Sequence, residues 1–129
     1  MATLNVSLTL SSTDVSSNNL SMTVTDALTV GPPQAGFSKL AANVNGGADV
    51  TLHTATANPT YFFIKHTGFQ SDGSTSTTNL LEVKFGSTDS LRLKANEFAF
   101  LPIVTGTAVK VVSGDAQTIL VEYAYFSAA

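Results

Sequence analysis

Residues 91–104, LRLKANEFAFLPIV, decide the fold class of this chain, because two strand patterns follow one another there. Residues 91–94 alternate leucine with a basic residue, which is the pattern of a strand with one buried face. Residues 98–103, FAFLPI, are apolar at every position, which is typical of a strand covered on both sides. Ala95–Asn96 predicts a turn between the two runs. The stretch therefore predicts a hairpin whose second strand lies deep in a β-sandwich.

The rest of the chain repeats such runs, separated by Gly, Asn and Pro. Residues 3–10, TLNVSLTL, and 20–25, LSMTVT, place apolar residues on one strand face and Ser, Thr or Asn on the other. Residues 61–64, YFFI, and most of 118–126 are apolar on both faces and predict central strands. Asn45-Gly46-Gly47 predicts a hairpin turn. Together the runs predict an all-β, antiparallel, jelly-roll-like sandwich of about nine or ten short strands.

The length of 129 residues predicts a single domain, with a distinct N-terminal part. Residues 1–30 contain twelve Ser or Thr residues and no basic residue, and Gly31-Pro32-Pro33 then interrupts regular structure. Two interpretations stay open. Residues 1–30 form an arm or hairpin attached to a main sandwich of residues 35–129, or they supply outer strands of that same sandwich.

Composition excludes several functions. Charged residues make up only 12% of the chain, and the six Lys and Arg residues are scattered, so we expect no nucleic-acid partner. No apolar run reaches the length of a membrane helix, and we expect no membrane partner. The first ten residues lack the charge and the apolar core of a secretory signal, which predicts assembly in a cytoplasm. Without cysteine, the chain has no disulfide and no thiolate metal site.

No residue pattern predicts catalysis or metal binding. His53 and His66 lie thirteen residues apart, and a metal site would need Asp49 or Asp72 as a third ligand. Metal sites in jelly rolls normally begin with a compact His-x-His motif, which this sequence does not contain. We therefore expect two surface histidines and no metal. The carboxylates are isolated from one another, and no G-x-S-x-G elbow occurs. We therefore expect no catalytic residue, no cofactor and no enzymatic activity.

Three predicted strands are apolar on both faces, which is many for one sandwich of this size. Large exposed apolar patches are rare on monomers, so a second subunit that covers the outer face would account for them. The sequence therefore predicts a homo-oligomer, and weakly charged strand edges favour the same conclusion.

Five segments together resemble small all-β structural proteins of tailed bacteriophage particles, especially marine ones. The segments are residues 5–14 (NVSLTLSSTD), 20–31 (LSMTVTDALTVG), 61–68 (YFFIKHTG), 91–103 (LRLKANEFAFLPI) and 119–126 (ILVEYAYF). They are patterns of core strands spread over most of the chain, and they contain no chemical signature. The resemblance therefore speaks to fold and context more than to a reaction.

The resemblance implies a non-enzymatic virion protein, a capsid decoration or cement protein on the outer face of the phage head. Such a protein stabilises contacts between capsomers, binds the major capsid protein and is favoured to be a trimer on the capsid surface. Its N-terminal arm would add a strand to the coat protein or to a neighbouring copy. The candidate interface residues are Leu4, Val6, Leu8, Leu10, Pro32, Pro33 and Phe69.

Two alternatives remain. The chain could occupy another structural position in a phage, such as a head fibre, the neck or the tail. It could instead be a carbohydrate-binding or adhesive β-sandwich, for which Phe69 beside Gln70 and Asp72 is the candidate site. The absence of tryptophan argues against glycan binding.

Overall fold

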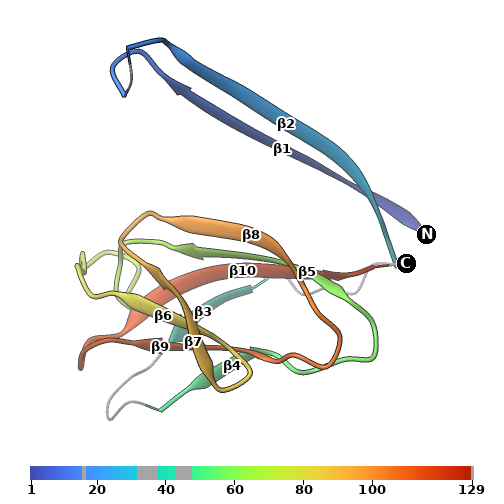
Figure 1. The fold of residues 1–129 in the computed structure, drawn as a ribbon. Coiled ribbons are helices and arrows are strands. Elements are labelled where there is room, and N and C mark those ends of the chain that lie inside the picture. Colours follow the sequence, from blue (N-terminus) through green and yellow to red (C-terminus); the bar gives the residue numbers. More distant parts are fainter. Residues whose placement is uncertain (16, 32–37, 43–47, 129) are drawn as a thin grey trace.

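A computed structural model describes the chain except for residues 16, 32–37, 43–47 and 129. The described residues form ten strands in three antiparallel sheets (Figure 1), which confirms the all-β prediction. The strands are β1 (Ala2–Ser12), β2 (Leu20–Val30), β3 (Ser38–Ala42), β4 (Val50–His53), β5 (Thr60–His66), β6 (Leu81–Phe85), β7 (Thr88–Leu93), β8 (Phe98–Ile103), β9 (Val109–Ser113) and β10 (Ile119–Ser127).

Two four-stranded sheets form the sandwich. One has the order β3-β10-β5-β8 and the other the order β4-β9-β6-β7. Their inner faces enclose one cluster of buried apolar side chains. Its members are Leu52, Phe62, Ile64, Leu81, Val83, Leu93, Ile103, Val109, Val111, Ile119 and Val121.

Strand β5 shows why the sequence folds this way. Its burial alternates residue by residue, with Phe62 and Ile64 fully buried between the sheets. Tyr61 and Phe63 point to the opposite, outer face, because successive side chains of a strand alternate. The strand pairs with β10 on one side and with β8 on the other, as predicted for a central strand.

Strands β1 and β2 form a separate two-stranded hairpin, which we call the arm. Eleven residue pairs join the two strands without a register shift. The arm lies over the outer face of the β3-β10-β5-β8 sheet and forms a third layer (Figure 1). Its root is held to the end of β10, where Gly31 N donates to Ser127 O at 2.8 Å and Val30 bridges to Ala128.

The predicted hairpin of residues 91–104 is wrong in its pairing. The turn at Ala95–Asn96 exists, and Asn96 adopts a positive φ of 71°, but β7 and β8 belong to different sheets. The turn is held instead by the end of β5, because Asn96 N donates to His66 O at 2.9 Å and His66 N donates to Glu97 O at 3.0 Å. The chain thus crosses from one sheet to the other at this point.

Strand β8 is also not deep in the sandwich. It is the edge of its sheet and pairs only with β5 among the described strands. Pro102 fits this position, because a proline cannot donate to a second ladder. The predicted turn Asn45-Gly46-Gly47 lies outside the described residues, and the flanking strands β3 and β4 do not pair, since they lie in different sheets.

Candidate interaction surface

The arm carries one apolar row and one hydroxyl-rich row. Its register places Leu4 opposite Leu28 and Leu8 opposite Val24, so these four side chains share one face. The other face carries mostly Ser, Thr and Asn side chains. A hairpin of this kind has one side suited to an apolar surface and one side suited to water.

The sheet below presents the matching apolar surface. Tyr61 and Phe63 of β5 lie beside Phe100 of β8 and Phe126 of β10 on the outer face. The rings of Tyr61 and Phe100 are stacked, with centroids 6.3 Å apart and an interplanar angle of 10°. Aromatic rings packed side by side on an outer sheet face are expensive to leave in water, so this face needs a cover.

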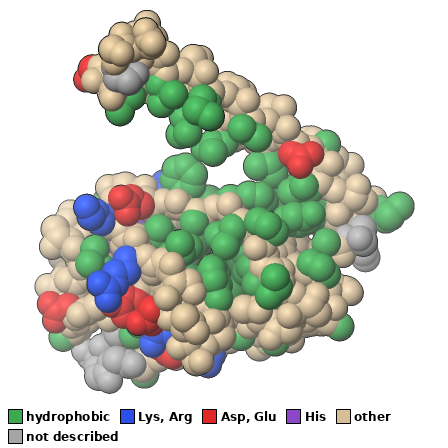
Figure 2. Space-filling model, viewed as in Figure 1, with side chains coloured by type: hydrophobic (Ala, Val, Ile, Leu, Met, Phe, Trp, Pro, Cys, Tyr) green, Lys and Arg blue, Asp and Glu red, His purple; other side chains and the backbone are tan. Residues whose placement is uncertain are grey.

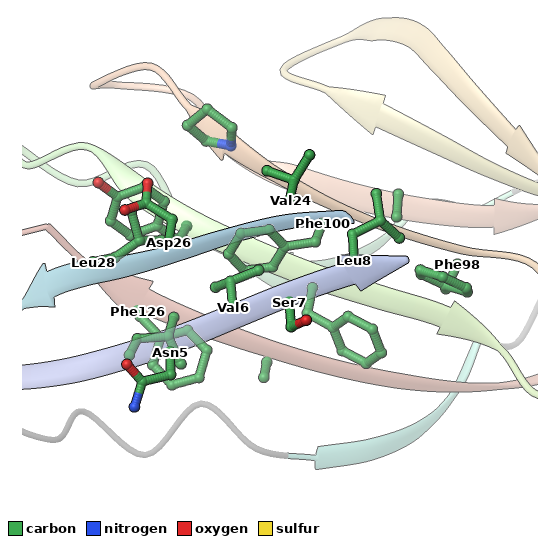
Figure 3. Close-up of a pocket in the computed structure, with 16 residues that line it drawn as sticks. Asn5, Val6, Ser7, Leu8, Val24, Asp26, Leu28, Phe98, Phe100 and Phe126 are labelled. Atoms are coloured by element: carbon green, nitrogen blue, oxygen red, sulfur yellow. The ribbon is translucent and has the colours of Figure 1, made fainter. Parts of the chain in front are cut away.

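A cleft of about 900 Å³ lies between the arm and this sheet. Figure 2 shows apolar side chains on both walls of the cleft. Among the residues that line it, Figure 3 labels Val6, Leu8 and Leu28 of the arm and Phe100 and Phe126 of the sheet. The arm therefore covers part of the outer sheet face. The sequence analysis predicted that a second subunit would cover this face.

The cover is incomplete toward the tip of the arm. Leu10, Met22 and Val24 keep 47%, 52% and 60% of their surface exposed, although all three belong to the apolar row. Phe98 on the sheet is 56% exposed. Half-buried Leu4 and Leu28 lie nearer the root. The two apolar walls thus diverge away from the root, and the distal part of both is open to a partner.

Asp26 interrupts the apolar row. It lies opposite Val6, lines the cleft, and accepts a hydrogen bond from Ala27 N at 2.8 Å through its own Oδ1. A carboxylate on an otherwise apolar strand face limits unspecific association of that face. The apolar row of the arm is therefore suited to docking, and its one charge acts against unspecific aggregation.

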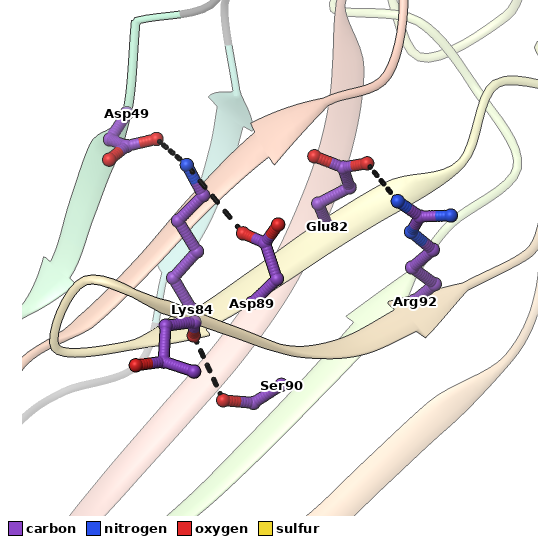
Figure 4. A network of polar contacts seen from close by, with 7 residues as sticks. Asp49, Glu82, Lys84, Asp89, Ser90 and Arg92 are labelled. Carbon is purple, nitrogen blue, oxygen red and sulfur yellow. Dashed lines mark hydrogen bonds and ion pairs between the residues drawn. The ribbon is translucent and has the colours of Figure 1, made fainter.

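The opposite face of the sandwich is charged. On the outer side of β6 and β7, Lys84 Nζ lies 2.9 Å from Asp49 Oδ1 and 3.7 Å from Asp89 Oδ1, and Arg92 pairs with Glu82 at 3.2 Å (Figure 4). The hydrogen bond to Asp49 raises the pKa of Lys84. Such exposed pairs add little stability, but they keep this face soluble. The apolar side is thus the one suited to docking.

His66 is a core residue, and its prediction as a surface histidine is wrong. It is fully buried at the end of β5, on the same face as Phe62 and Ile64. Its Nδ1 accepts from Gly68 N at 2.9 Å, so the proton resides on Nε2, which donates to Asn79 O at 2.9 Å. Both ring nitrogens are used within the fold.

His53 is also buried, contrary to the surface prediction. A register shift in the β4–β9 ladder turns both Leu52 and His53 inward, so simple alternation fails there. The ring of His53 lies 4.7 Å from that of Tyr125, and its Nε2 lies 3.4 Å from Thr60 Oγ1. Burial disfavours the charged imidazolium and lowers the pKa of His53 below its ordinary value of 6.5.

The lowered pKa of His53 predicts a loss of stability in acid. Below pH 6.5 the unfolded chain binds a proton at His53 more readily than the folded chain. The free energy of unfolding therefore decreases as the pH is lowered. The slope is at most about 1.4 kcal/mol per pH unit, until the folded state also protonates. Urea unfolding of the wild type and of His53→Phe at pH 7.5 and 5.5 measures this change in the free energy of unfolding. The variant should lose less stability in acid, and equal losses would refute the assignment.

The predicted glycan site is a tightly bonded loop. Asp72 accepts hydrogen bonds from Ser74 N at 2.9 Å and Thr75 N at 2.8 Å, and also from the Thr75 hydroxyl. The hydrogen bond from that hydroxyl is the largest cause that lowers the pKa of Asp72 to about 2. Phe69 is 39% exposed but does not line the cleft. The carboxylate is thus already engaged by its own loop.

The predicted interface residues fall into three groups. Leu4, Val6 and Leu8 line the cleft, while Leu10 lies exposed in the same apolar row. Phe69 lies apart from the cleft lining. The prolines at positions 32 and 33 lie outside the described residues. The sequence analysis did not predict that the sheet forms the second wall of the cleft. The runs of β5, β8 and β10 that are apolar on both faces are the sequence feature that indicates it.

Within the described residues, no group of three His, Asp or Glu side chains could hold a metal ion. The same part of the chain has no helix long and apolar enough to cross a membrane. No protein-family model, curated protein or solved structure matches the chain.

Proposed function

We propose that this chain is a non-enzymatic structural protein of a bacteriophage particle and decorates the outer face of the capsid. The proposal joins the resemblance of its strand segments to such proteins with one structural observation. That observation is the projecting arm, whose apolar row and facing aromatic sheet leave a cleft of about 900 Å³ open toward its tip. The apolar side chains that line this surface suit it to contact with another protein, and the surface lies on the side of the sandwich opposite the charged face.

The strand order supports a jelly roll as the finer description of the sandwich. Strands β3 to β10 alternate between the two sheets except at the β6–β7 hairpin, which gives the orders β3-β10-β5-β8 and β4-β9-β6-β7. Two four-stranded sheets linked by such crossings are the jelly-roll arrangement, which is frequent in capsid proteins.

A decoration protein needs many weak, well-placed contacts rather than chemistry. Each bound copy stabilises the assembled shell by mass action, and several linked contacts reinforce one another. The major capsid protein is the partner that this role requires, and the open end of the arm is the surface that we assign to it. The location would be the capsid surface, after assembly in the host cytoplasm.

The proposal predicts the copy number of this chain in purified particles. Quantitative mass spectrometry should find it at the same order of abundance as the major capsid protein. A few copies per particle would place the chain in the neck, tail or a fibre instead. Absence from particles would overturn the proposal and favour a free adhesive module. A virion protein of different known copy number, measured in the same sample, calibrates the ratio.

A further inference from the structure

The sheet edges of this protein differ in how they are protected against pairing with another chain. Strand β3 has five residues, and β4 has four and a register shift. Strand β7 carries Asp89 and Arg92, and β8 carries Pro102. Strand β2 carries Asp26, and its end bridges to Ala128, the residue after β10. Short length, charge, proline and bulges are the usual means of blocking an edge.

Strand β1 has none of these protections. Its eleven residues, ATLNVSLTLSS, include no charge and no proline, and its ladder with β2 has no register shift. In the described part of the chain, β2 is its only paired strand, so the second edge of β1 is open over its whole length. An edge of this kind is a template for another strand.

We propose that the open edge of β1 pairs with the β1 edge of a second copy of this chain, antiparallel and about a two-fold axis. The proposal concerns the isolated chain and does not depend on the proposed place in a particle. It commits to a second copy because an antiparallel copy of β1 would place apolar residues opposite apolar residues and hydroxyl residues opposite hydroxyl residues.

Full overlap of two antiparallel β1 strands places residue i opposite residue 14 − i, because the strand runs from residue 2 to residue 12. Ser7 then lies opposite Ser7 of the second copy, Leu4 opposite Leu10, and Val6 opposite Leu8. Even numbers always meet even numbers, so the apolar rows join on one face and the hydroxyl rows on the other.

The result is a four-stranded sheet with the order β2-β1-β1-β2 across two copies. A two-stranded hairpin that stands alone in water is marginally stable, and four strands with a shared apolar face are much more stable. The pairing also doubles the apolar face of the arms. It predicts a dimer, whereas the phage resemblance favours a trimer.

Single cysteines test the pairing, because the natural chain has none. In the proposed sheet, Ser7→Cys residues of two copies are one strand spacing apart, about 5 Å, which a disulfide can bridge. Thr25→Cys is the matched control, since Thr25 is exposed and lies directly opposite Ser7 in the hairpin. Its two copies would be three strand spacings apart, about 14 Å, which is too far. Mild oxidation should give a covalent dimer with Ser7→Cys and not with Thr25→Cys.

Lysine at the same two positions gives an independent measurement without oxidation. Ser7→Lys places two like charges opposite each other and should raise the dimer dissociation constant by about fivefold, whereas Thr25→Lys should not change it. Light scattering and sedimentation at micromolar concentration measure both. A wild-type monomer, which would leave the edge to a foreign strand, would overturn the proposal. A trimer, or equal cross-linking of both cysteines, would overturn it too.

Discussion

Deletion of residues 1–29 is expected to leave a sandwich that still melts cooperatively but lacks both the proposed dimer contact and the proposed binding to the particle. No member of the buried core cluster lies in the arm. The apolar residues of the arm are at most half-buried up to Leu28, so we expect a loss of no more than about 3 kcal/mol in the free energy of unfolding. Binding to particles that lack the protein should weaken by at least about a hundredfold.

The deletion keeps Val30 and Gly31 for a structural reason. Val30, the last residue of the arm, is 6% exposed and bridges to Ala128, and Gly31 donates to Ser127 O, so both residues are packed against the sandwich. Calorimetry and light scattering of the truncated and full-length chains measure the two effects separately. If the truncated chain lost its cooperative transition, the arm would be part of the core and the separation of roles would be wrong.

Phe62→Ala should be the most damaging single substitution that we consider, at about 3–5 kcal/mol of unfolding free energy. Phe62 is fully buried in the core, and its ring is stacked parallel to Tyr123 and Tyr125, with centroids 6.1 and 6.5 Å away. Removal of the ring leaves a cavity between the two sheets and removes these contacts.

Phe98→Ala is the control for this substitution. The residue type is the same, but Phe98 is 56% exposed, so we expect a loss below about 1 kcal/mol. Chemical unfolding of both variants gives the comparison, and Phe62→Leu replaces Phe62→Ala if the alanine variant does not fold. Similar losses at the two positions would contradict the described core.

The strands themselves were predictable because their signal is local. Alternation over residues 3–10 and 20–25 predicted β1 and β2, and the doubly apolar runs predicted the central strands β5 and β10. Alternation along β5 also indicates that His66 is buried, because it shares a strand face with Phe62 and Ile64. The prediction of a surface histidine did not use this pattern and was therefore wrong.

The pairing of strands was not predictable in the same way, because it is decided by contacts far apart in the sequence. The turn at Ala95–Asn96 was correctly placed, yet it joins two sheets, since β8 pairs with β5 and β7 with β6. His53 faces inward because of a register shift that depends on β9. Alternation indicated the apolar row of the arm, and the resemblance suggested that this row forms an interface. Their facing wall required the fold, because only the sheet brings Phe63, Phe100 and Phe126 together.

The root of the arm has a mechanical consequence. Its attachment at Val30 and Gly31 meets the end of β10, which lies between β3 and β5 in the middle of its sheet. The chain itself continues from Gly31 to β3, which is the edge strand of the same sheet. A pull on the arm is therefore shared between β3, through the covalent chain, and β10, through the two root contacts, and β10 has a ladder on each side.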